Sequence, residues 1–318
     1  MHEECVSVVK FESTLERWTR RVFSSRPVLA DKLGLLARST GRSTDLFLKT
    51  WMGRVGLAII GFFVFAIIYA DLAVPYDRFD TSNDILQHSS WDHPFGTDDV
   101  GRDVFKRTIH GTQASLTVGF VAMALSMGLG TFVGLTSGYW GGWRDEVIMR
   151  INDVFLSIPW LVLMIVIAAI WGRQDLLAVI VVIGITGWST TARIVRSQVL
   201  TLKSRQFVER AKAIGSSDWH IIWKHIFPNV VPLIFANAIL TVAIAILSES
   251  TLSWLRLGPQ NVETWGKILE DAWTVHAEIG GPYLFTIMPG LCIVFVVLGF
   301  TFVGYAMDEV LNPKLRNR

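Results

Sequence analysis

Six long runs of apolar residues, separated by polar segments, dominate the chain of 318 residues. Each run is close to the roughly 20 residues that an α-helix needs to cross about 30 Å of hydrocarbon. Because the runs are continuous and carry almost no charge, they predict membrane-spanning helices and an all-α fold. The expected spans cover residues 55–74, 115–139, 154–171, 176–192, 227–247 and 283–307.

Prolines mark three of these runs. Pro159 interrupts the third run, Pro228 and Pro232 open the fifth, and Pro289 lies inside the sixth. Each proline removes one backbone hydrogen bond, a loss that membrane helices tolerate when neighbouring groups satisfy the freed carbonyl. We expect the chain to turn into the fifth span at Pro228.

The composition agrees with a membrane protein. Hydrophobic residues make up 51% of the chain and charged residues 18%, which excludes a disordered protein. The two cysteines, Cys5 and Cys292, exclude a disulfide scaffold or a cysteine-based zinc site. The formal net charge of +2 gives no reason to expect nucleic-acid binding. The first apolar run begins after about 50 polar residues, too late for a cleavable signal peptide.

The near-neutral total conceals a strong division of charge between the two sides of the membrane. Six spans place both termini on one side, and that side holds 22 basic residues against seven on the other. Basic residues mark the cytoplasmic side, so we expect a multi-pass protein of the plasma (inner) membrane with cytoplasmic N- and C-termini. The expected organisation is a cytoplasmic tail of residues 1–54, a six-helix membrane domain of residues 55–307 with a cytoplasmic loop at 193–226, and a cytoplasmic tail of residues 308–318.

The outer segment of residues 75–114 is rich in aspartate. We expect it to be a solvated surface that meets another protein. His88 and His93 in this segment do not have the spacing of a metal site, so no metal is expected.

The cytoplasmic loop contains two short helical segments on either side of Gly215. The first, residues 207–214, has good helix formers and ends at the glycine, as many helices do. Ser216, Ser217 and Asp218 suit the N-cap and first turn of the second segment. Apolar residues of the second segment recur at three- and four-residue spacing and predict a single apolar face: Trp219, Ile222, Trp223 and Ile226.

This loop resembles the EAA loop of importer-type ABC permeases, in which Glu-Ala-Ala precedes a glycine and an Ile-x-Pro ending. The matching positions are Glu209, Arg210, Ala211, Gly215, Ile226 and Pro228, with Arg210 in place of the middle alanine. Three further stretches, residues 93–119, 138–159 and 246–258, are similar to the dipeptide, oligopeptide and nickel permeases of that group. The similar order of the six spans extends the resemblance to the C-terminus.

The resemblance implies a permease of the type I ABC importer kind, whose loop docks into a groove on an ATPase subunit. The residues expected to couple to the ATPase are Glu209, Arg210, Ala211, Gly215, Ser217, Asp218, Trp219 and Ile222. The resemblance also implies a homologous permease chain as heterodimer partner, two ATPase subunits that bind ATP-Mg, and an extracytoplasmic solute-binding protein. From the residues alone, Glu209 could instead pair with Lys212 or Arg205.

The sequence carries no P-loop. That motif needs GxxxxGK[ST], and the Gly266-Lys267 pair is followed by isoleucine. We therefore expect a transport subunit rather than an enzyme, with no cofactor bound by this chain and with ATP hydrolysis on partner subunits.

A few polar residues lie inside or near the spans. Asn237, Ser248 and Glu249 are candidates for the translocation path, although Glu249 could equally be a structural partner for neighbouring groups. Asp153 follows Arg150 by three residues and is expected to pair with it. Small residues at every fourth position of the second span predict a close contact with another helix, of this chain or of a partner: Ser126, Gly130, Gly134 and Gly138.

Two other functional classes compete with the ABC permease. An ion-coupled secondary transporter often shows carboxylates at mid-membrane and repeated halves, and neither is evident in the sequence. An intramembrane enzyme needs clustered His, Asp or Glu at one depth, whereas all seven histidines lie outside the predicted spans. Di- and oligopeptides are the leading candidates for the solute, with nickel chelates and oligosaccharides as alternatives in the same family.

Overall fold

The computed structural model describes residues 46–73, 81–82, 84–278 and 282–311. In these ranges the named elements are all helices, and one isolated bridge joins Thr97 to Asp103. The all-α prediction is therefore confirmed. Contacts divide the chain into one unit of Met1–Val55 with Tyr305–Arg318 and a second unit of Gly56–Gly304. The second unit contains the helices that carry the candidate sites.

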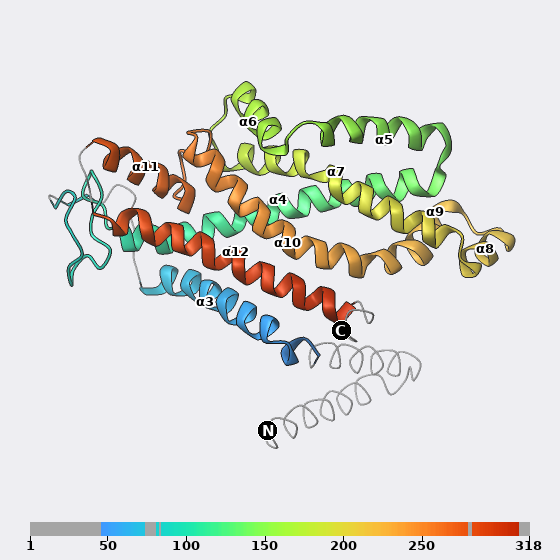
Figure 1. The fold of residues 1–318 in the computed structure, drawn as a ribbon, viewed down its shortest axis with the longest axis horizontal. Helices are drawn as coiled ribbons and strands as arrows, with labels where there is room; N and C mark the ends of the chain where they lie inside the picture. The colour runs from blue at the N-terminus through green and yellow to red at the C-terminus, as the bar shows by residue number, and fades with distance from the viewer. Residues whose placement is uncertain (1–45, 74–80, 83, 279–281, 312–318) are drawn as a thin grey trace, which may run out of the picture. The chain divides into compact units, whose positions relative to one another are not determined.

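Five described helices are long and apolar enough to cross a membrane, or six if the bent pair α5–α6 forms one broken span (Figure 1). The long helices are α3 (Trp51–Ala73), α4 (Val104–Trp140), α7 (Leu176–Lys203), α10 (Phe227–Trp254) and α12 (Leu284–Leu311). The bent pair is α5 (Gly142–Ser157) and α6 (Trp160–Trp171). The shorter elements are α8 (Gln206–Ala213), α9 (Asp218–Ile221), the π-helix η1 (Ile222–Ile226) and α11 (Trp265–Glu278).

The third predicted span is not one straight helix. α5 and α6 are inclined by 92° at the break between them. Pro159 has no N–H, and its ring favours an extended conformation of Ile158 (φ −88°, ψ 130°), so the hydrogen-bond ladder of α5 ends there. The predicted span of residues 154–171 also left out the first half of α5. That half is polar, and hydropathy detects only apolar stretches.

Helix α4 begins at Val104, well before the predicted start of the second span at residue 115. Asp103 caps it, because its Oδ1 accepts hydrogen bonds from the backbone N–H groups of Phe105 (2.8 Å) and Lys106 (3.1 Å). The first turns are polar, so hydropathy alone did not include them. They are nevertheless buried, with Arg107 at 0% and Thr108 at 3% exposure.

Helix α7 is the neighbour with which α4 makes its most extensive contact. A Cβ atom at Gly130 would lie 2.6 Å from the carbonyl oxygen of Trp188, and one at Gly134 would lie 2.6 Å from that of Ala192. Such close backbone approach requires the missing side chains. The small-residue face of the second span therefore packs on this chain's own α7 rather than on a partner.

We expect Gly134→Ala to destabilise the protein by about 1–3 kcal/mol, because the added methyl group has no room against the α7 backbone. Gly128→Ala on the same helix is the matched control, since nothing lies within 4 Å of the position that its Cβ would occupy. Thermal unfolding of both purified variants in one detergent measures the difference. Equal unfolding temperatures for Gly134→Ala and the wild type would contradict this packing.

Candidate functional site

Helices α8, α9 and η1 form a compact loop at one end of the Gly56–Gly304 unit, opposite α11 (Figure 1). Gly215 separates α8 from α9 with a φ of +80°, a left-handed conformation that glycine adopts without strain. The N–H of Ser216 donates to the carbonyl of Ala211 (3.1 Å), and that of Gly215 donates to Lys212 (2.9 Å), which is a Schellman C-cap. The predicted helix–Gly–helix geometry is therefore confirmed.

The second half of the loop is continuous with the following span. Ser217 caps α9, since its Oγ accepts a hydrogen bond from the N–H of His220 (3.4 Å). The N–H of Phe227 donates to the carbonyl of Ile222, an i→i−5 bond that closes the π-helical turn. The predicted turn at Pro228 is wrong. Pro228 lies in the first turn of α10, where a missing N–H is tolerated, and the chain continues as helix on both sides.

The apolar residues of this segment do not form the single face that the sequence predicted. Ile222 and Ile226 are buried at 1% and 0% exposure, whereas Trp219 and Trp223 are 47% and 49% exposed. The i→i−5 bonding of η1 changes the number of residues per turn, so three- and four-residue spacing no longer keeps these side chains together. Ala211 and Ile222, two of the predicted coupling residues, therefore pack inside this chain.

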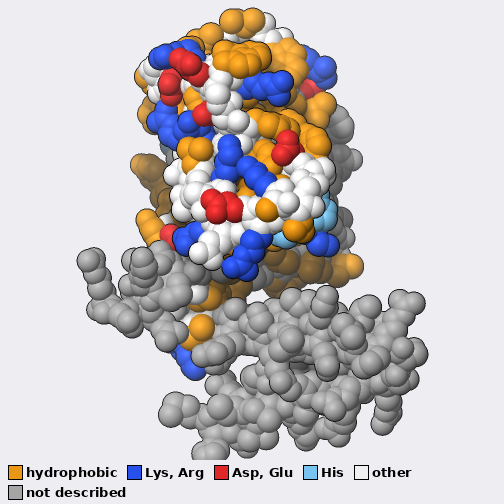
Figure 2. Space-filling model, turned by 90° about the vertical axis from the view of Figure 1, so that its right-hand side faces the viewer, with side chains coloured by type: hydrophobic (Ala, Val, Ile, Leu, Met, Phe, Trp, Pro, Cys, Tyr) orange, Lys and Arg blue, Asp and Glu red, His pale blue; other side chains and the backbone are white. Residues whose placement is uncertain are grey.

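The exposed surface of the loop combines charge with apolar area. Figure 2 views this end of the molecule and shows Lys and Arg side chains beside hydrophobic ones. Glu209 and Arg210 of α8 are exposed, and Glu209 forms no ion pair with another residue of the described part of the chain. Asp218 accepts a hydrogen bond from the hydroxyl of Tyr139 (2.7 Å). The surface of the loop thus carries the carboxylate of Glu209, which has no ion-pair partner in the described residues, and the exposed side chain of Trp219. Buried residues of the same loop hold its shape.

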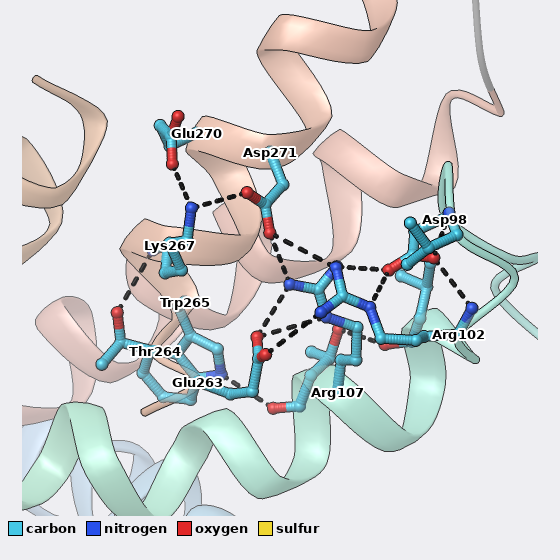
Figure 3. A network of polar contacts seen from close by, with 12 residues as sticks. Asp98, Arg102, Arg107, Glu263, Thr264, Trp265, Lys267, Glu270 and Asp271 are labelled. Atoms are coloured by element: carbon cyan, nitrogen blue, oxygen red, sulfur yellow. Dashed lines mark hydrogen bonds and ion pairs between the residues drawn. The ribbon is translucent and has the colours of Figure 1, made fainter. Parts of the chain in front are cut away.

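A second polar cluster surrounds Arg107 at the opposite end of α4 (Figure 3). Its fully buried guanidinium contacts Asp98 (Nη1 to Oδ2, 2.7 Å), Glu263 (Nη2 to Oε2, 2.7 Å) and Asp271 (Nη2 to Oδ2, 2.6 Å). Arg102 also contacts Asp98 (Nε to Oδ2, 2.6 Å). These ion pairs join the segment before α4, α4 itself, the segment before α11 and the middle of α11.

Lys267 extends this Arg107 cluster along α11. Its Nζ donates to Glu270 Oε2 (2.5 Å) and Asp271 Oδ1 (2.7 Å). Burial opposes charge on Asp271, but Arg107 and Lys267 together hold the pKa of Asp271 below its ordinary value. Burial likewise opposes charge on Lys267, but hydrogen bonds to Asp271 and Glu270 raise the pKa of Lys267. Asp271 and Lys267 are therefore both charged at neutral pH.

The expectation that the acidic outer segment is simply a solvated surface is wrong for Asp98. Its side chain is fully buried, as is nearly all of Glu263 in the segment that precedes α11. Burial of these carboxylates is possible because arginines satisfy them. The available sequence signal was the presence of two arginines, Arg102 and Arg107, between an acidic segment and an apolar run.

The three pathway candidates in α10 have different surroundings. Glu249 is fully buried and accepts hydrogen bonds from Ser253 Oγ and Thr264 Oγ1, each at 2.7 Å. Ser248 Oγ donates to the backbone carbonyl of its own helix at Ile244 (2.7 Å). Asn237 is half-buried. The contacts of Glu249 favour the structural alternative, because they link α10 to the segment that precedes α11.

Asp153 pairs with Arg193 of α7 (Oδ1 to Nη2, 2.7 Å) rather than with Arg150 as predicted. A second ion pair, Arg196 with Asp145 (Nη2 to Oδ2, 2.6 Å), joins the same two helices. The prediction failed because α7 continues past residue 192 to Lys203, so that both arginines lie on a helix beside α5 instead of in a loop.

We expect Arg107→Gln to destabilise the protein by about 3–5 kcal/mol, because it leaves clustered buried carboxylates without their counter-charge. Arg173→Gln is the control: Arg173 pairs with Asp175 on an exposed loop, where ion pairs contribute little. Denaturant unfolding of both variants in the same detergent measures the effect. Similar losses for the two variants would contradict a special role of the Arg107 cluster.

A bundle of apolar helices long enough to cross a membrane, with a compact helix–Gly–helix loop at one end, is the architecture of a multi-pass membrane protein. The chain belongs to the family of binding-protein-dependent transport system inner membrane components, which matches residues 130–317. It is accordingly a permease subunit of an ABC importer.

Three relatives cover most of the chain. The dipeptide transport system permease protein DppC of Alkalihalophilus pseudofirmus is 38% identical over 85% of this chain and 88% of its own length. The oligopeptide transport system permease protein OppC of Bacillus subtilis is 36% identical over 90% and 94%. The glutathione transport system permease protein GsiD of Pectobacterium atrosepticum is 32% identical over 95% and 100%.

The fold is shared with a solved ABC importer. Inward-facing structures of the MetNI methionine ABC transporter superpose with TM-scores of 0.52 and 0.53 at 19% identity. They cover 65% of this chain and 96% or 97% of the other. This similarity supports the prediction of a type I importer permease fold.

Proposed function

We propose that this chain is one of two permease subunits that together form a path for di- or oligopeptides through the membrane. The observation that carries the proposal is its 38% identity, over 85% of the chain, to a dipeptide permease. The oligopeptide and glutathione permeases support the same class of solute. Peptides are therefore favoured over nickel chelates and oligosaccharides.

In this proposal the loop of α8, α9 and η1 docks on the ATPase. Exposed Glu209 and Arg210 offer charges for pairing, and exposed Trp219 offers an anchor for a pocket. Buried Ala211 and Ile222 would act by holding the shape of the loop. Because the chain carries no P-loop, ATP-Mg would bind to two partner ATPase subunits.

The proposed orientation places this loop and both termini in the cytoplasm. The excess of basic residues on the loop side of the sequence supports it. The Arg107 cluster and α11 would then lie outside, where a solute-binding protein delivers the peptide. The division into a tail of residues 1–54, a membrane domain of residues 55–307 and a tail of residues 308–318 stays a prediction.

The proposal predicts that an affinity tag on this chain recovers a second permease and a subunit with the GxxxxGK[ST] motif from native membranes, identified by mass spectrometry. Proteoliposomes of that complex, supplied with its binding protein, should accumulate labelled dialanine or trialanine only with ATP. Vanadate should block the uptake. Uptake driven by a proton or sodium gradient without ATP would instead establish the secondary transporter. Transport of neither peptide would overturn the peptide assignment.

We expect Gly215→Val to lower peptide uptake about tenfold while ATP hydrolysis continues. A φ of +80° disfavours a β-branched residue, by about 1–2 kcal/mol or more, and so changes the direction of the loop. Nothing lies within 4 Å of the added Cβ, so a steric clash is not the cause. Gly215→Asn is the matched control, because asparagine tolerates this conformation. Full peptide uptake by Gly215→Val would contradict the proposed coupling role of the loop.

A further inference from the structure

Tyr139 lies at the last turn of α4, directly beneath the loop of α8, α9 and η1. Its side chain is only 3% exposed. The phenol hydroxyl donates a hydrogen bond to Asp218 Oδ1 at 2.7 Å, and Asp218 is the first residue of α9. A polar contact therefore joins the end of the longest helix to the start of the shortest.

Two lysines from different helices also contact Tyr139. The Nζ of Lys203, at the end of α7, lies 5.6 Å from the centre of the Tyr139 ring, and that of Lys212, in α8, lies 5.1 Å from it. Both distances suit a cation–π interaction. Lys203 Nζ also donates to the backbone carbonyl of Tyr139. One side chain thus contacts α7, α8 and α9 at the same time.

Apolar packing strengthens the same junction. Tyr139 belongs to a buried cluster that includes Val199 of α7, Val208 of α8 and Ile221 of α9. The neighbouring Trp140 packs edge-to-face on Trp219, with ring centres 5.3 Å apart. The loop is therefore continuous with the core of the bundle.

Helix α9 is the first turn of a helical segment that continues through η1 into α10. Tertiary contacts with Tyr139 and its apolar neighbours fix the start of this segment, where the chain changes direction at Gly215. A phenylalanine would fill the space of Tyr139, but only the hydroxyl reaches the Asp218 carboxylate. The hydroxyl is therefore the part of the side chain that packing alone does not explain.

We propose that Tyr139 is a positioning residue that fixes the α8–α9 loop to the end of α4, so that displacement of the loop by the ATPase moves α4. This inference rests on the proposed docking function of the loop. Helix α4 has 37 residues and is roughly 55 Å long at 1.5 Å per residue. Its far end carries Arg107, so the movement reaches the opposite side of the bundle.

The test compares Tyr139→Phe with the wild type in the complete transporter in nanodiscs, with Tyr305→Phe as the control because that phenol is exposed. Hydrogen exchange of the amides of Ile221 and Ile222, which donate to backbone carbonyls of residues 217–219, should accelerate about tenfold in Tyr139→Phe, as expected for loss of a hydrogen bond to a charged group. The number of ATP molecules hydrolysed per trialanine transported should rise several-fold. Both readouts should stay at wild-type values in Tyr305→Phe.

A double-mutant cycle with Asp218→Ala identifies the pair. If the two side chains act on each other, adding Tyr139→Phe to Asp218→Ala should not accelerate exchange further. Additive acceleration would overturn the assignment of Asp218 as the partner. Unchanged exchange in Tyr139→Phe would show that the Tyr139 hydroxyl does not hold α9. Faster exchange with an unchanged ATP-to-peptide ratio would show a structural bond without a positioning role.

The experiment also separates this inference from the proposed function. If the wild-type chain recovers no ATPase, the docking function fails, and the positioning role fails with it. Hydrogen exchange of the full-length chain alone still reports whether the Tyr139–Asp218 bond holds α9. If the ATPase is recovered equally with wild-type and Tyr139→Phe chains but coupling is unchanged, only the positioning role fails.

Discussion

The packing of α4 against α7 is the contact on which both ends of the molecule depend. In lipid there is no hydrophobic force to bring helices together, so close backbone approach must supply the attraction through dispersion. The glycines of α4 permit it, with Gly134 directly against the α7 backbone at Ala192. Both helices continue beyond their apolar centres. The first turn of α4 carries Arg107 and its last turn carries Tyr139, and α7 ends beside Tyr139 at Lys203.

The two ends of α4 are joined to their neighbours by different forces. At the Arg107 end, buried charges lose water and are stable only because each finds a counter-charge at hydrogen-bond distance. Trp265 of α11 adds a hydrogen bond from Nε1 to the carbonyl of Thr108 (2.9 Å). At the Tyr139 end, most of the contact is buried apolar surface. The Tyr139 hydroxyl and the ammonium groups of two lysines add directional polar contacts. In both places a segment outside the span is attached to the same helix.

Sequence reasoning succeeded where the signal was local. Long apolar runs identified the spans, and Gly215 and Ser217 marked the helix ends of the loop because caps depend on near neighbours. Sequence reasoning failed where the structure depends on contacts between residues far apart in the chain. Arg107 and Glu263 are 156 positions apart, so nothing near either one in the sequence reveals the pair. Local rules also failed at Pro228, because the π-helical turn before it lets the helix continue.

The distribution of ion pairs determines which parts of the bundle can move at low cost. Alternating access requires some helices to shift while others stay together as rigid bodies. Separating α11 from α4 would leave carboxylates and a guanidinium buried without partners, at about 3–5 kcal/mol. Helix α5 is joined to α7 by two ion pairs, Asp153 with Arg193 (side chains 52% and 57% exposed) and Asp145 with Arg196 (12% and 31% exposed). Exposed pairs contribute little, so the ion pairs between α5 and α7 cost less to separate than the buried ones that join α4 to α11.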